Sequence, residues 1–326
     1  MSSSASQRRA RGRGGWIVGG LCALALGAFA PAGAGGGDTQ TGAFAESEPS
    51  ARGAALAGAL APLVDDPTAV YWNPARLAEV ETRGIAAGYA DLFGLHLVRQ
   101  AAFFVAWPRH ERSLVWERGT LSTTTRQSHT AWGLGLQSKQ IDLDPESYAE
   151  YDVALAHARR GPLGLDWGFV FHLLMVRSDL ADVSATGFAG DLAIARAIGP
   201  RIDGALVLRS LVSDLSWKAS GREPLTRTVE AGIGARLGRL RVPATVAVDL
   251  DAGTLRQVAA GAEWSPIGST LTLRGGLRWR DDGDGAEVRA AGGFGLHWKE
   301  VAFDYGLSMG PSELGETHRF GLQFGF

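Results

Sequence analysis

Residues 317–326 read Thr-His-Arg-Phe-Gly-Leu-Gln-Phe-Gly-Phe, and larger side chains alternate with polar or small ones through the whole stretch. Successive side chains of a β-strand point to opposite faces, so every second residue shares one environment. The stretch therefore predicts a strand with an apolar medium on one side and a polar or small-residue space on the other. The first face carries His318, Phe320, Leu322, Phe324 and Phe326, and the second carries Arg319, Gly321, Gln323 and Gly325.

The same period of two continues upstream to Gly84 and divides into about fourteen runs, each near the nine to eleven residues that a tilted strand needs to cross a bilayer. Short breaks such as 160–162 alternate with longer polar links such as 138–147, which is typical of outer-membrane barrels. We therefore predict an all-β transmembrane fold, an antiparallel outer-membrane β-barrel of about 14 strands over residues 84–326. The predicted strands are 84–92, 98–107, 130–137, 149–159, 164–175, 186–197, 202–212, 225–237, 242–250, 254–264, 270–280, 286–297, 299–308 and 316–326.

One further strand candidate, residues 112–117, would make the number odd. Single-chain bacterial barrels have even counts, so we assign this segment to a small extra hairpin or a long turn. Trp107, Trp264 and Trp298 fall at strand ends on the rim of short turns, where indole rings prefer the membrane interface. The alternative is that these tryptophans belong to the core of a soluble β protein.

Composition agrees with a barrel. The 326 residues include 45 Gly, carry a formal net charge of -2 and have a mean hydropathy of +0.00, which is too polar for a bundle of membrane helices. A barrel strand shows only every second side chain to lipid. No basic stripe interleaved with aromatic residues is present, so we expect no nucleic-acid partner.

The N-terminal residues 1–34 predict a signal peptide of the Sec type. Arginines precede an uncharged apolar core, residues 16–30, and a small-residue cleavage pattern lies at 32–34. The alternative is a single N-terminal anchor helix. The only cysteine, Cys22, lies in this signal, so the mature chain would hold no thiol. Residues 35–50 are rich in Gly, Ser, Thr and acidic residues and predict a flexible leader.

Residues 51–83 predict an N-terminal helix followed by a plug segment. The stretch 51–64 has leucines at helical spacing among small side chains, and Asp65, Asp66 and Pro67 end the helix. Many inward positions of the predicted strands are Gly or Ala, which leaves lumenal space that such an element could occupy. The turn that follows the acids is formed by Tyr71, Trp72, Asn73, Pro74 and Ala75.

Two groups of charged residues are candidates for a functional role: the acidic pair that follows the predicted helix and the inward-facing charges of the predicted strands. Asp65 and Asp66 could be an acid and base pair or cation ligands, but adjacent acids point different ways and no third ligand is spaced with them. We favour roles in capping the turn and in pairing with lumenal arginines. The inward-facing charges could tune selectivity or pair with lumenal acids. They are Arg274, Arg278, Arg289, Asp304 and Arg319.

The seven histidines show no metal spacing, and no nucleophile-elbow sequence is present. We therefore predict no enzymatic activity, no metal site and no cofactor.

The segment 51–75 and the C-terminus together resemble the PorV/PorQ family of bacterial outer-membrane proteins, within the wider FadL-like barrels. The shared features are a small-residue helix, the pair Asp65-Asp66, the aromatic-Asn-Pro-Ala turn at 71–75 and the ending at 304–326. Arg76 stands where the family usually has glycine. The resemblance implies a fourteen-stranded barrel with an N-terminal segment inside or beneath it. It also implies that the terminal Phe326 is the signal read by the barrel-assembly machinery.

The family's function is not uniform. PorV-like members serve type IX secretion, and FadL relatives take up hydrophobic molecules. We therefore expect an outer-membrane protein of a Gram-negative-type bacterium that binds exported cargo proteins or serves surface transport. The alternatives are a FadL-like channel for hydrophobic small molecules and a purely structural barrel. A pocket beside the plug would favour transport, whereas apolar residues on the long loops, such as Leu215 and Trp217, would favour partner binding. The remaining expected partner is outer-membrane lipid.

Overall fold

The computed structural model describes residues 43–44, 48–94, 96–117, 120–142, 145–179, 183–219, 221–281, 285–310 and 315–326, and over 110–128 it describes only the backbone. The predicted signal peptide, 1–34, and most of the predicted leader, 35–50, lie outside these residues. Among the described residues, no helix combines the length and apolar character needed to cross a membrane.

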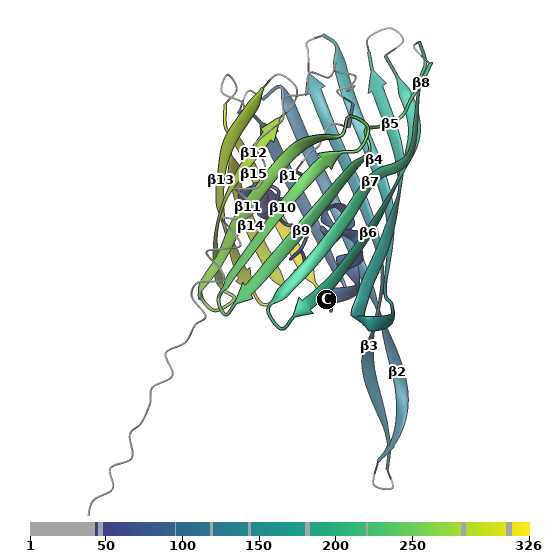
Figure 1. The fold of residues 1–326 in the computed structure, drawn as a ribbon, viewed down its shortest axis with the longest axis vertical. Coiled ribbons are helices and arrows are strands. Elements are labelled where there is room, and N and C mark those ends of the chain that lie inside the picture. The colour runs from purple at the N-terminus through teal and green to yellow at the C-terminus, as the bar shows by residue number, and fades with distance from the viewer. Residues whose placement is uncertain are drawn as a thin grey trace, which may run out of the picture. The chain divides into compact units, whose positions relative to one another are not determined.

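The described chain is almost entirely β-structure (Figure 1). Short helical elements lie at the N-terminal side and at one turn: α2 (Ala51–Ala55), α3 (Ala69–Trp72), η1 (Pro74–Glu79) and η2 (Pro162–Gly164). The strands are β1 (Gly84–Leu92), β2 (Val98–Glu117), β3 (Thr120–Asp142), β4 (Ser147–Arg160), β5 (Leu165–Ser178), β6 (Ala185–Gly199), β7 (Ile202–Trp217), β8 (Gly221–Glu223), β9 (Thr228–Leu237), β10 (Leu240–Asp249), β11 (Thr254–Ile267), β12 (Leu271–Asp281), β13 (Ala286–Trp298), β14 (Val301–Ser308) and β15 (Thr317–Gly325).

The strands form one closed antiparallel barrel. Each strand of the wall pairs with the next wall strand along the chain, β7 pairs with β9, and β1 pairs with β15, from Gly84 opposite Gly325 to Asp91 opposite His318. Among the described residues, the short β8 pairs only with the end of β7, so 14 of the 15 strands make the wall. The prediction of a 14-stranded outer-membrane-type barrel is confirmed.

Alternation along the strands separates an apolar outer face from the lumen. In β15, Phe320, Leu322 and Phe324 are exposed, whereas Arg319, on the opposite face, is buried. The exposed rings and chains require an apolar surrounding, which a bilayer supplies. Trp107 and Trp264 are also about half exposed, next to the rim of short turns, as a belt of interfacial indole rings requires.

The two rims differ as the sequence predicts. Tight turns such as 161–164 and 238–239 lie at one end, which we call the short-turn rim, and longer links such as 218–227 lie at the other, the long-loop rim. The extra candidate 112–117 is a continuation of β2, paired with the first part of β3 after a bulge between Pro108 and His110. The predicted extra hairpin is therefore present, and it projects beyond the short-turn rim (Figure 1).

The predicted helix 51–64 is much shorter in the structure. The α-helix α2 ends at Ala55, and turns fill 56–63. Ala57 and Gly58 have positive φ angles of 54° and 86°, a left-handed conformation that ends a helix. Pro74 opens the short helical element η1, where its missing N–H and fixed φ suit the first helical position.

Candidate functional site

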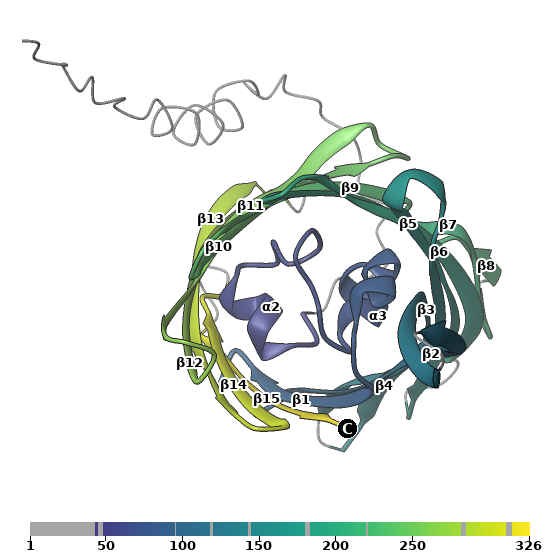
Figure 2. The same ribbon diagram turned by 90° about the horizontal axis from the view of Figure 1, so that it is seen from below.

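Residues 48–80 lie inside the barrel and form the plug (Figure 2). The plug touches the wall where the wall has glycine. A Cβ atom on Gly168 would lie 2.6 Å from the backbone nitrogen of Ala75, and one on Gly276 would lie 2.6 Å from the carbonyl carbon of Leu56. Such distances are too short for any side chain, so plug backbone packs directly on wall backbone. Small inward residues of the wall therefore leave the room that the plug occupies.

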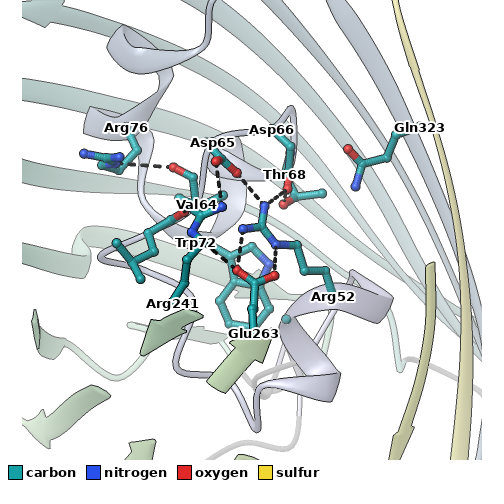
Figure 3. A network of polar contacts seen from close by, with 12 residues as sticks. Arg52, Val64, Asp65, Asp66, Thr68, Trp72, Arg76, Arg241, Glu263 and Gln323 are labelled. Carbon is teal, nitrogen blue, oxygen red and sulfur yellow. Dashed lines mark hydrogen bonds and ion pairs between the residues drawn. The ribbon is translucent and has the colours of Figure 1, made fainter. Parts of the chain in front are cut away.

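One arginine of the plug links α2 to the acidic pair and to the wall (Figure 3). Arg52 Nη1 donates to Asp65 at 2.6 Å and to Asp66 at 2.7 Å. Its Nε and Nη2 donate to the two carboxylate oxygens of Glu263 in β11, both at 2.9 Å. The side chains of Arg52, Asp66 and Glu263 are all less than a tenth exposed. This bidentate geometry makes the contact a directional anchor between plug and barrel.

The two predicted acids have different surroundings. Asp66 accepts hydrogen bonds from the backbone N–H and the hydroxyl group of Thr68, so it also caps the turn. Asp65 is partly exposed and makes a second ion pair, 2.9 Å long, with Arg241 of β10. Burial alone would raise the pKa of Asp65, but the charges of Arg52 and Arg241 hold that pKa well below its usual value.

The acids therefore serve to fasten the plug. Both acids pair with Arg52 of the plug, and Asp65 also pairs with a lumenal arginine of the wall, Arg241. Among the described residues, neither acid pairs with Arg274, Arg278, Arg289 or Arg319, the lumenal arginines named from the sequence. Arg52 is the only charged residue of 51–64, and a single charge inside a small-residue segment was the signal that could have identified it.

The aromatic-Asn-Pro-Ala turn shapes the plug interior. The Asn73 side chain is fully buried, donates to the carbonyl oxygen of Ala61 at 2.9 Å, and accepts from the backbone N–H of Ala75 at the start of η1. The indole N–H of Trp72 donates to the Ser50 hydroxyl group at 2.9 Å. Pro74 lies against the wall, with its carbonyl carbon 2.6 Å from where a Cβ of Gly168 would stand.

Tyr71 is the member of this turn that borders two of the lumenal spaces. It is partly buried, and the guanidinium group of Arg209, from β7, lies 5.1 Å from its ring centroid. Arg209 also donates to the Tyr71 carbonyl oxygen at 2.8 Å. The wall thus holds this part of the plug through a second arginine, Arg209, which no sequence pattern marks.

The predicted lumenal charges all find partners inside the barrel. Arg274 donates to Glu263 at 2.9 Å and to Asp304 at 2.6 Å. Arg289 donates to Glu287 at 3.0 Å. The other two reach the N-terminal segment: Arg278 pairs with Glu48, and Arg319 donates to the Glu48 carbonyl oxygen at 2.8 Å and to Ser308 at 3.0 Å. Ion pairing is therefore the structural role of these side chains.

The plug lies between lumenal spaces. Towards the long-loop rim a cavity of about 380 Å³, which we call the upper chamber, is lined by Tyr71 and Trp72 of the plug and by wall residues such as Gln100, Gln257 and Arg278. A smaller space of about 170 Å³ adjoins it and also contacts Tyr71. At the short-turn rim a mouth of about 890 Å³ is lined in part by Asp65 and Asp66. The plug therefore separates the chamber from this lower mouth.

The last predicted site residue, Phe326, lies at the short-turn rim. It is 62% exposed, and its backbone N–H donates to the Arg83 carbonyl oxygen. Its role as an assembly signal stays a prediction. Among the described residues, no group of three or more His, Cys, Asp or Glu side chains is arranged to hold a metal ion.

Comparisons with known proteins give a fold but no sequence family. No family model matches the chain, and no curated protein matches its sequence. Among solved structures, the CymD monoaromatic hydrocarbon channel is similar with a TM-score of 0.62 and 13% identity, over 85% of this chain and 97% of that one. The TodX deltaS2S3 mutant monoaromatic hydrocarbon channel is similar with a TM-score of 0.56 and 10% identity, over 85% of this chain and 99% of that one. These likenesses show the fold of the barrel alone, whereas the resemblance to the PorV/PorQ family stays a prediction.

Proposed function

We propose that this protein is a plugged channel that passes hydrophobic small molecules through the outer membrane of a Gram-negative-type bacterium. The observation that carries the proposal is the plug itself, which stands between an upper chamber of about 380 Å³ and a lower mouth of about 890 Å³. A barrel of fourteen strands encloses more space than its own side chains fill, and an inner segment held by reversible polar contacts can control that space. The likeness of the fold to two hydrocarbon channels supports the same proposal.

Export through the Sec route, directed by a signal peptide over 1–34, and insertion by the barrel-assembly machinery belong to this proposal. They rest on the sequence patterns of the N-terminus and of the last strand. No enzymatic step is proposed, because the buried acids already serve as anchors of the plug.

The protein-export function of PorV-like relatives has less support here. It would use apolar side chains on the long loops, and the sequence pointed to Leu215 and Trp217. Leu215 is fully buried against residues such as Leu174, and the Trp217 indole N–H donates to Glu223 at 2.6 Å. Neither residue offers a free apolar surface at the long-loop rim.

Uptake by intact cells tests the proposed function. Cells that lack the protein are compared with complemented cells for the rate of entry of radiolabelled toluene at low concentration, and membrane fractionation with heat-modifiable migration confirms the folded barrel. We expect complementation to raise the entry rate. Equal rates in the two strains, with the folded barrel present in the outer membrane, would leave the structural-barrel alternative standing. Recovery of the protein in the soluble cytoplasmic fraction would contradict the membrane assignment itself.

A further inference from the structure

A groove on the outside of the barrel combines aromatic rings with positive charge at the short-turn rim. It is lined by Arg83, Trp107, Pro108, Arg109 and Trp132, and we call it the outer groove. Trp107 and Trp132 are both exposed and lie opposite each other on β2 and β3. Indole rings on the outside of a barrel lie at the membrane interface, so the outer groove lies at the level of the lipid headgroups.

Arg83 is held beside this groove by one of the two rings. Its guanidinium carbon lies 5.6 Å from the centroid of the Trp107 ring, and the residue is exposed. A guanidinium group that stacks on a ring uses its face, which leaves the N–H donors at its edge accessible. Among the described residues, Arg83 forms no ion pair. Its donors can therefore bind an acceptor outside the protein.

Two more arginines extend the positive charge along the same rim. Arg109 follows Trp107 by two positions on β2, so both side chains point outward. Arg159 follows His157 by two positions on β4, and the centroid of the His157 ring lies 4.4 Å from that of Trp132. Both arginines are exposed, and both lie close enough to His157 for their charges to act on its ring. No Asp or Glu of the described chain lines the groove.

The outer surface between this groove and the middle of the bilayer is apolar. Phe103 of β2, Leu134 of β3 and Leu155 of β4 are exposed on the outward face of the wall. Outward residues of a strand follow one another at about 6–7 Å, so these side chains lie within the length of an acyl chain from the rim. A lipid can therefore pack its chains on them while its headgroup stays beside the arginines.

We propose that the outer groove binds a phospholipid with an anionic headgroup, whose phosphate accepts hydrogen bonds from Arg83 and Arg109. Phosphate oxygens match the forked donors of a guanidinium group. Clusters of basic residues at the membrane surface attract anionic headgroups. A zwitterionic headgroup fits less well, because its ammonium group would add a further positive charge to the cluster. The groove lies outside the wall, so this inference is independent of passage through the lumen.

Native mass spectrometry of the protein purified in detergent tests the inference, because it counts the lipids that stay bound during a titration. The probes are phosphatidylglycerol, which is anionic, phosphatidylethanolamine, which is zwitterionic, and glycerol 3-phosphate, which lacks acyl chains. We expect phosphatidylglycerol to bind most tightly. Arg83→Gln should weaken its binding about 5-fold, and the triple change of Arg83, Arg109 and Arg159 to Gln about 100-fold. Arg83→Lys keeps the charge but not the planar fork, so it should weaken binding less than Arg83→Gln.

The matched control is Lys299→Gln. Lys299 is also exposed and lies over an exposed tryptophan ring, 5.4 Å from the centroid of Trp298, but it does not line the outer groove. The control removes the same charge as Arg83→Gln, so a general attraction between protein and lipid would weaken equally in both variants. Heat-modifiable migration first shows that each variant is a folded barrel.

The inference is overturned if phosphatidylglycerol and phosphatidylethanolamine bind equally, if neither lipid is retained, or if Arg83→Gln and Lys299→Gln behave alike. Glycerol 3-phosphate should not displace phosphatidylglycerol at equal concentration. If it does, the groove is a site for soluble phosphates and the assignment to a lipid is wrong.

Discussion

Replacing Arg52 by methionine would remove the guanidinium group that joins α2, the acidic turn and β11. Methionine keeps much of the volume of the side chain, so the change acts mainly on the ion pairs. Removing one partner of a buried ion pair typically costs about 3–5 kcal/mol. Here Glu263 keeps Arg274 at 2.9 Å, and Asp66 keeps its bonds from Thr68. We therefore expect a cost at the lower end of this range, and the closed state of the plug should be destabilised by about 3 kcal/mol.

A change of about 3 kcal/mol corresponds to a roughly 100-fold shift between the closed and displaced positions of the plug. Single-channel recording in planar bilayers measures that shift as the frequency of opening, and liposome swelling measures it as solute flux. We expect Arg52→Met to open about 100 times more often than the unchanged protein. The control Arg236→Gln should not, because its partner Asp203 keeps an ion pair with Arg76 at 3.3 Å. If Arg52→Met inserts as a folded barrel and its openings match those of the unchanged protein, the anchor role assigned to Arg52 is wrong.

Three further outcomes are expected. Gly276→Val should lower the temperature of heat-modifiable unfolding, because the added side chain overpacks against Leu56 at a cost of about 1–3 kcal/mol. The control Gly275→Val should not lower it, because a Cβ there would lie 3.9 Å from its nearest neighbour. Equal shifts of the two variants would contradict the plug contact. Arg52 and Arg241 lower the pKa of Asp65, so the ion pairs of Asp65 are complete above the unfolded pKa of about 3.9 and are lost only as pH falls through the folded pKa. The conductance of the barrel should therefore stay constant from pH 8 to about 4. Opening of the plug at pH 6 would refute this expectation. Phe326→Ala should slow the appearance of folded barrel in the outer membrane without changing its unfolding temperature, since the ring is 62% exposed; unchanged assembly kinetics would remove its signal role.

The barrel was predictable because its evidence is local. Alternation in 317–326 requires only neighbouring residues, and a Phe or Leu at every second position specifies the lipid-facing side wherever the strand lies. The inward glycines could be interpreted in the same way, since Gly168 and Gly276 mark positions where an inner element must approach closely. The strand count followed from the spacing of turns and from the even-number rule.

The anchor of the plug was not predictable because its partners are distant in sequence. Arg52 and Glu263 are separated by 211 positions, and nothing near either residue specifies the other. The length of the helix was overestimated for a related reason. Leucine spacing in 51–64 favours a helix, but in the lumen Leu56 packs against Gly261 and Gly276, and these contacts favour a turn at Ala57 and Gly58. Trp217 was assigned to a loop because polar residues surround it, whereas strand β7 continues through it.

The order of the plug and the wall along the chain has a consequence for how the molecule folds. The plug precedes β1, yet it contacts Gly306 of β14 and Arg319 of β15, which are synthesised long after it. The seam between β1 and β15 encloses whatever is already inside when it closes. The N-terminal segment must therefore wait, largely unstructured, until its docking surfaces exist and must enter before the seam is complete. Contacts of such long sequence separation form slowly, so a chain whose seam closes first would become an empty barrel with its plug trapped outside.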